Sequence, residues 1–159
     1  MWLGRGVFMA VLIVLLLMRT VVTVIRIDGH SMDPTLRSGQ WALVDLISRR
    51  FQFQGWQYGD VVILRFPGDP LRSLYVKRVI GLPGDILLIE NGRVKRNNVL
   101  VVESYVLDGQ RTENGVVALP TIVPPKSYIV LGDNRQISND SRFFGVVPEA
   151  NLVGKVMFY

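Results

Sequence analysis

The chain has 159 residues, a formal net charge of +5 and no cysteine, and its length suits one domain with a membrane anchor. Without cysteine, disulfides and thiolate metal sites are excluded, and a single histidine argues against a catalytic zinc. The basic residues are scattered along the chain rather than gathered in one patch, so we expect no nucleic-acid partner.

The first segment of the chain is apolar. Residues 7–18 contain no polar side chain, and Arg5 and Arg19 flank them. A membrane-spanning helix needs about 20 mostly apolar residues, and arginines near its ends can extend to the lipid headgroups. We therefore predict that residues 1–25 form a transmembrane anchor. A cleaved signal peptide and a buried core helix are the alternatives; the missing small-residue cleavage site argues against the first, and the missing polar face against the second.

From residue 26 onward the chain is predicted to be mainly β. Short β-branched runs alternate with turns rich in Gly, Pro, Asn and Asp, and no ten-residue segment has helical periodicity. Asn91-Gly92, between two such runs, is a strong β-hairpin signal. We expect a compact antiparallel β-barrel or sandwich over residues 26–159, with strands at 41–47, 60–66, 74–80, 86–90, 93–95, 99–102, 104–107, 116–119, 127–131 and 152–158.

Phe51, Phe53 and Trp56 form an aromatic group between two of these runs. Alternation places Phe51 and Phe53 on one face, which is typical of a half-buried strand. Contact of the aromatic rings with the membrane interface is the alternative, since such rings are favoured there. The sequence leaves both interpretations open.

The chemistry is expected at Ser31 and Lys77. A serine attacks a peptide carbonyl only when a base removes its proton. The only histidine, His30, directly precedes Ser31, and adjacent residues of an extended segment point to opposite faces. A lysine without its charge can serve instead, and serine–lysine pairs are a known variant of the catalytic triad.

The position of Lys77 in its strand favours that role. In a strand over residues 74–80, Tyr75, Lys77 and Val79 share one face, and Arg78 lies on the other. Lys77 then faces apolar neighbours and no adjacent carboxylate, which lowers the pKa of its amine and favours the neutral, basic form. The alternative is a solvated surface lysine, which predicts polar neighbours on that face.

Four segments resemble, in the same order, the motifs of type I signal peptidases: residues 29–36 around Ser31, residues 59–62, residues 75–85 around Lys77, and residues 132–145. Together with the N-terminal segment they extend over nearly the whole chain. The resemblance implies a membrane-anchored serine endopeptidase of minimal form, without cofactor or metal, that removes signal peptides from exported preproteins. It also implies a bacterial plasma membrane, with the catalytic domain on the extracytoplasmic side; organelle inner membranes and thylakoids are the alternatives.

The resemblance assigns roles to individual residues. Ser31 is the nucleophile, its N–H contributes to the oxyanion hole, and Lys77 is the general base. Ser138 is the hydroxyl that hydrogen-bonds and orients the lysine amine, and Asp140 and Arg142 form a supporting ion pair. The remaining motif positions expected at the site are Gly29, Met32, Pro34, Tyr75, Gly132, Asp133 and Asn134.

The chain also departs from the family pattern. Gly29 stands where some members have a serine whose hydroxyl completes the oxyanion hole, and His30 stands where glycine or aspartate is usual. Gln136-Ile137 replaces a more polar pair, and the interval between residues 85 and 132 is too short for the large extra β-domain of longer members. By resemblance, the substrates carry small side chains at the first and third positions before the cleaved bond.

Two other functions are compatible with parts of the pattern. A self-cleaving repressor protease shares a serine–lysine dyad by resemblance, but it needs a DNA-binding helix-turn-helix before the dyad. A membrane-tethered, non-catalytic β-domain would bind partners only, and the presence of Ser31, Lys77 and Ser138 argues against it. The sequence does not predict the oligomeric state.

Overall fold

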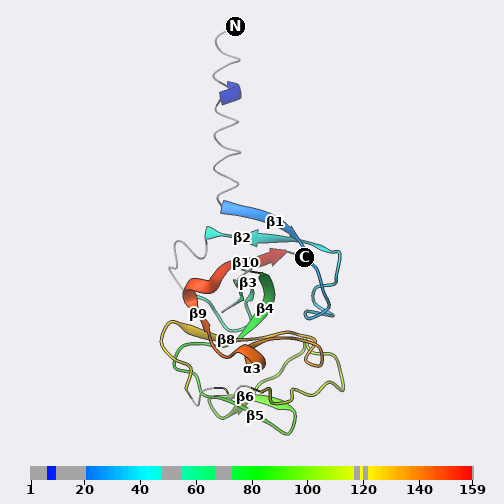
Figure 1. The fold of residues 1–159 in the computed structure, drawn as a ribbon, viewed down its shortest axis with the longest axis vertical. Coiled ribbons are helices and arrows are strands. Elements are labelled where there is room, and N and C mark those ends of the chain that lie inside the picture. The colour runs from blue at the N-terminus through cyan, green and yellow to red at the C-terminus, as the bar shows by residue number, and fades with distance from the viewer. Residues whose placement is uncertain are drawn as a thin grey trace.

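The computed structural model describes residues 7–9, 21–47, 55–66, 73–116, 119 and 122–158. These residues form mainly antiparallel β-structure, as predicted (Figure 1). The elements are β1 (Val22–Arg26), β2 (Trp41–Asp45), β3 (Val61–Arg65), β4 (Leu74–Gly81), β5 (Leu87–Glu90), β6 (Arg93–Arg96), β7 (Val99–Leu100), β8 (Ser127–Leu131), α3 (Ser141–Phe144), β9 (Val147–Pro148), the 3-10 turn η1 (Glu149–Asn151) and β10 (Leu152–Phe158).

The strands form two sheets. The larger one has seven strands in the order β1-β2-β10-β3-β4-β8-β9, and the smaller one has the order β5-β6-β7. Figure 1 places β1 and β2 at one end of the domain and the β5–β6 hairpin at the other. The hairpin turns at Asn91 and Gly92, both with positive φ (53° and 78°), as the Asn-Gly signal predicted.

The core consists of three clusters of buried side chains, and β3 belongs to two of them. Val61 and Ile63 pack with the chain around Ser31, while Val62 and Leu64 pack with β8, β9 and β10. Both faces of β3 are therefore buried, which explains its unbroken apolar sequence. A third cluster lies between the two sheets and includes Ile80, Leu87, Val94, Ile129 and Leu131.

The N-terminal boundary of the domain differs from the prediction. Residues 22–25, which we assigned to the anchor, form part of β1, where every residue pairs with β2. This run is β-branched, and such residues fit a pleated strand better than a helix. Residues 7–9 are helical, but within the described ranges no helix is long and apolar enough to cross a membrane. Residues 1–6 and 10–20 of the predicted anchor lie outside the described ranges.

Other predicted elements also change. Residues 104–107, predicted as a strand, form a turn; Val116 and Leu119 are not in a strand, and residues 117–118 lie outside the described part of the chain. Trp56 is buried in the core at 4% exposure, so its contact with the membrane interface is ruled out, and Phe51 and Phe53 lie outside the described part.

Candidate active site

Ser31 lies in the turn-rich connection between β1 and β2. Two side chains close to it anchor this connection, since Met32 and Leu36 are buried in a core cluster and the Leu36 N–H donates to the Met32 carbonyl at 2.9 Å. Pro34 stays on the exposed side of the turn. The buried side chains of Met32 and Leu36 fix the backbone at Ser31, and Ser31 itself lines a cavity.

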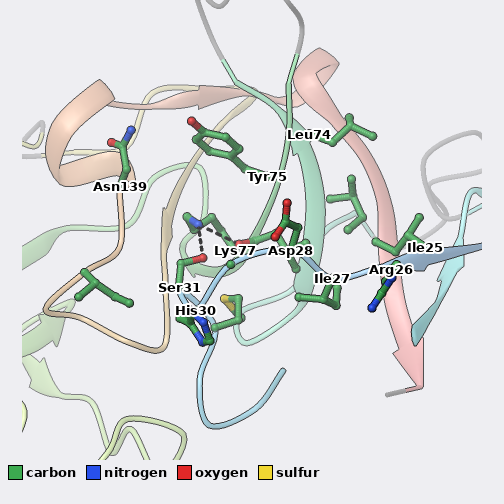
Figure 2. A pocket seen from close by; sticks show the side chains of 15 residues that line it. Ile25, Arg26, Ile27, Asp28, His30, Ser31, Leu74, Tyr75, Lys77 and Asn139 are labelled. Carbon is green, nitrogen blue, oxygen red and sulfur yellow. Dashed lines mark hydrogen bonds between the residues drawn. The ribbon is translucent and has the colours of Figure 1, made fainter. Parts of the chain in front are cut away.

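Lys77 approaches Ser31 from β4. Its side chain is almost fully buried, with 3% of the residue exposed, and its Nζ lies 2.8 Å from Ser31 Oγ and 3.0 Å from the Val76 carbonyl oxygen. Figure 2 shows the amine directed at the serine hydroxyl. The structure thus brings together the two residues that the sequence singled out, although they lie 46 positions apart.

Burial determines the protonation of this lysine. Loss of solvent lowers the pKa of Lys77 from 10.5 to about 8; the negative charges of Asp140 and Asp133 oppose this shift, and the positive charge of Arg142 adds to it. The Tyr75 ring, stacked on Phe66, lies 5.3 Å from Nζ and covers one side of the amine. A substantial neutral fraction is therefore available close to pH 8.

Asp140 and Asp133 are the two carboxylates whose charge acts on Lys77, and an arginine binds each of them. Asp140 accepts from Arg142 Nε and Nη2 at 2.8 and 2.9 Å, so the predicted ion pair is present. Asp140 also accepts from the Gly132 N–H at 3.0 Å and caps helix α3. Bidentate pairing of this kind holds the carboxylate away from the lysine amine.

Asp133 is held in the same way by Arg78. The guanidinium donates from Nε to Oδ1 at 2.8 Å and from Nη2 to Oδ2 at 2.6 Å, and Thr35 donates to the same carboxylate. The remaining guanidinium nitrogen of Arg78 donates to the Gly59 carbonyl at 2.8 Å. We did not include Arg78 among the candidate site residues. The sequence feature that indicates Arg78 is its position next to Lys77 in β4. Alternation places Arg78 on the opposite face, and a buried arginine keeps its charge and needs a carboxylate partner.

Ser138 lies next to Ser31, but it does not make the hydrogen bond to the Lys77 amine that the resemblance implied. Its Oγ is buried and has no hydrogen-bond partner among the described residues. A Cβ added at Gly132 would collide with Ser138 Oγ and would lie 2.5 Å from the Ser31 carbonyl oxygen. Only glycine therefore fits between Ser138 and Ser31, and in this structure the Val76 carbonyl, not Ser138, fixes the amine beside the serine.

The neighbours of Ser31 in sequence have other roles. The His30 Nδ1 lies 3.0 Å from Asp33 Oδ2, and the imidazole is 64% exposed, which agrees with the prediction that it does not serve Ser31. Gly29 has φ +97°, a conformation that residues with a side chain rarely adopt. Gly29 thus supplies a particular backbone conformation at the start of the Ser31 turn, at the position where some family members have a serine.

A cavity of about 520 Å³ opens beside Ser31 and Lys77. The end of β1 and the connection to Ser31 form one wall, and the first half of β4 forms another (Figure 2). Its apolar lining includes Ile25, Ile27, Ile63, Leu74, Val76 and Ile137. Within the described residues, no cluster of three or more His, Cys, Asp or Glu side chains is placed to hold a metal ion.

Comparison with known proteins places this site in a family. A family model described as signal peptidase, peptidase S26, matches residues 2–159. The chain is 34% identical over 167 residues to signal peptidase IB of Staphylococcus aureus, a match that covers 96% of this chain and 85% of that protein. It is 35% identical over 161 residues to the probable signal peptidase I-2 of Synechocystis, with coverages of 97% and 71%.

A solved structure gives the same assignment. The crystal structure of a signal peptidase I from Enterococcus faecalis V583 matches with a TM-score of 0.57 and 28% sequence identity, covering 65% of this chain and 98% of that one. The chain therefore belongs to the signal peptidase family, peptidase S26. Its activity is that of a serine endopeptidase of the signal peptidase I type, as the sequence predicted.

The buried pair of Asp133 and Arg78 gives a first testable prediction. In Asp133→Asn the buried pair with Arg78 loses its negative partner, and we expect a loss of about 3–5 kcal/mol in the free energy of unfolding. Glu90→Gln is the control, because Glu90 and Lys95 form an exposed ion pair at 2.6 Å whose loss should change stability by less than about 1 kcal/mol. Denaturant unfolding followed by tryptophan fluorescence measures both; equal losses would contradict the account.

Proposed function

We propose that Ser31 is the nucleophile and Lys77 the general base of this endopeptidase. The observation that carries the proposal is the 2.8 Å separation of Lys77 Nζ and Ser31 Oγ at a buried amine whose pKa is lowered to about 8. The neutral amine accepts the hydroxyl proton as Oγ attacks the scissile carbonyl carbon, which forms a tetrahedral oxyanion. The Ser31 N–H is the oxyanion donor that the turn supplies.

The same lysine completes the reaction. As the tetrahedral intermediate collapses, Lys77 returns the proton to the leaving amine, and an acyl ester remains on Ser31. A water molecule, deprotonated by the neutral Lys77, then attacks the ester carbonyl. When this second intermediate collapses, the bond to Ser31 Oγ breaks, Lys77 returns the proton to Oγ, and the new carboxyl end of the cleaved peptide leaves. No metal or cofactor takes part in these steps, since a nucleophile, a base and a backbone donor are sufficient for acyl transfer.

The substrates that we propose are preproteins with a signal peptide. Strand β4 pairs with β8 from Arg78 onward, whereas Leu74–Lys77 pairs with β3 alone in the described pairings. The other backbone edge of this half-strand lies at the cavity, and an extended peptide can add there as a further strand. The apolar wall formed by Ile25, Ile63 and Val76 suits small apolar side chains before the cleaved bond.

We further propose that the N-terminal segment anchors the enzyme in a bacterial plasma membrane, with the catalytic domain on the extracytoplasmic side. The run without polar side chains at residues 7–18 supports this, and β1 begins at Val22, four positions beyond the end of that run. The full chain should stay in the membrane pellet after alkaline carbonate extraction, and protease should reach the domain only from the extracytoplasmic side. Release into the supernatant, or digestion only from the cytoplasmic side, would contradict the proposal.

The dyad itself is tested with the detergent-solubilised chain, a preprotein substrate and sequencing of the new N-terminus. Ser31→Ala and Lys77→Ala should each lower kcat more than about 1,000-fold, because nucleophile and base act as a unit. Lys77→Arg should fail equally, since a guanidinium stays protonated. His30→Ala is the matched control and should keep most of the activity; a loss as large as that of Ser31→Ala would show that the histidine is the base.

A further inference from the structure

Residues 103–112, which we call the strap, cross over the last motif without forming a regular helix or strand. A strand was predicted at residues 104–107, within the strap, yet the strap is held by polar side chains rather than by a sheet. Thr112 is buried, and the side chain of Glu103 is only 10% exposed. A buried polar connection in an irregular segment fixes a particular geometry more than it adds stability.

The first attachment of the strap is an ion pair between Glu103 and Arg135. Arg135 Nη2 lies 2.6 Å from Glu103 Oε1 and Nη1 lies 3.0 Å from Oε2, with the arginine side chain fully buried. The Tyr105 hydroxyl also donates to Glu103 Oε1 at 2.9 Å. Burial raises the pKa of Tyr105, so this hydroxyl keeps its proton and remains a donor.

The second attachment is Gln110, whose side-chain amide hydrogen-bonds to Asn134 and to Arg135 in the last motif. Its Nε2 donates to Asn134 Oδ1 at 3.1 Å, and its Oε1 accepts from the Arg135 N–H at 3.0 Å. Arg135 Nη1 adds a bond to the Thr112 hydroxyl. The backbone and side chain of residues 134 and 135 are thereby fixed from one side by the strap.

Asn134 connects this network to the nucleophile. Its backbone N–H donates to the carbonyl oxygen of Ser31 at 3.0 Å. The Tyr105 ring lies 4.1 Å from the guanidinium carbon of Arg78, the residue that binds Asp133 next to Asn134. The strap therefore contacts both sides of the turn that holds the Ser31 carbonyl, and no strap residue lines the cavity beside the dyad.

We propose that Glu103 and Gln110 are positioning residues for the nucleophile. They fix Asn134 so that its N–H holds the Ser31 carbonyl, and this contact keeps Ser31 Oγ within hydrogen-bond distance of Lys77 Nζ. The inference rests on the proposed function, because it assigns Ser31 as the nucleophile. Since the strap touches neither the cavity nor the amine, it acts on the rate of the chemical step and not on substrate binding.

The test compares the full chain in detergent with Glu103→Gln and Gln110→Ala, at a temperature at which each is fully folded. We expect kcat for a preprotein to fall about 10- to 100-fold in both variants, with KM within about twofold of the wild type. Glu113→Gln is the matched control, since Glu113 is 75% exposed just beyond the strap and the substitution removes the same charge. It should leave both constants unchanged.

A second readout does not depend on activity. Amide hydrogen exchange at Asn134 should accelerate at least about tenfold in Glu103→Gln and Gln110→Ala, and not in Glu113→Gln. If Glu103→Gln does not fold, Gln110→Ala decides, because it leaves the ion pair with Arg135 in place. A lowered melting temperature with unchanged kcat, a raised KM with unchanged kcat, or unchanged Asn134 exchange would overturn the positioning role.

The same experiment separates this inference from the function on which it rests. A wild-type chain that does not cleave the preprotein, or a Ser31→Ala variant that does, would contradict the proposed function. Wild-type cleavage that depends on Ser31 but is not affected by either strap variant would overturn only the role of the strap.

Discussion

The burial of the Lys77 amine is the constraint on which the rest of this structure depends. Lowering the pKa of Lys77 from 10.5 to about 8 corresponds to roughly 3 kcal/mol of differential destabilisation of the ammonium form. A carboxylate in direct contact with the amine would reverse this effect, because it stabilises the charged form. The catalytic domain must therefore bury Lys77 and keep every nearby carboxylate occupied elsewhere.

Two arginines meet this second condition, Arg142 in the last motif and Arg78 on β4. Asp140 is bound by Arg142, and Asp133 is bound by Arg78, each through two hydrogen bonds. Both carboxylates are buried, yet neither is free to approach the amine. These pairs also organise the backbone. Asp140 accepts a hydrogen bond from the Gly132 N–H, and Asn134, which follows Asp133, donates its N–H to the Ser31 carbonyl.

Part of this arrangement follows from the sequence, and part depends on contacts between distant segments. The alternation in β4 places Lys77 and Arg78 on opposite faces, so a buried lysine with apolar neighbours was predictable from local geometry. The Asn91-Gly92 turn was predictable for the same reason, because its backbone preference is local.

The partners of the buried arginines were not predictable in this way. Arg78 and Asp133 are 55 positions apart, and Glu103 and Arg135 are 32 apart, and no periodicity links such pairs. The segment at residues 104–107 has the composition of a strand but forms a turn, and the flanking side chains of Glu103 and Gln110 bind the last motif. Residues 22–25 were assigned to the anchor because they extend the apolar run to spanning length, whereas their β-branched side chains and pairing with β2 make them a strand.

The most direct test of the account is the titration of the Lys77 amine itself. The chain contains four lysines, so with 15N-lysine labelling the Nζ signal of Lys77 is the one missing from Lys77→Met. A base works only when deprotonated; cleavage must therefore rise with pH through the pKa of Lys77. The account predicts that the Lys77 signal titrates with a midpoint of about 8 and that kcat/KM rises with the same midpoint. Titration of Lys77 near 10.5 would contradict it.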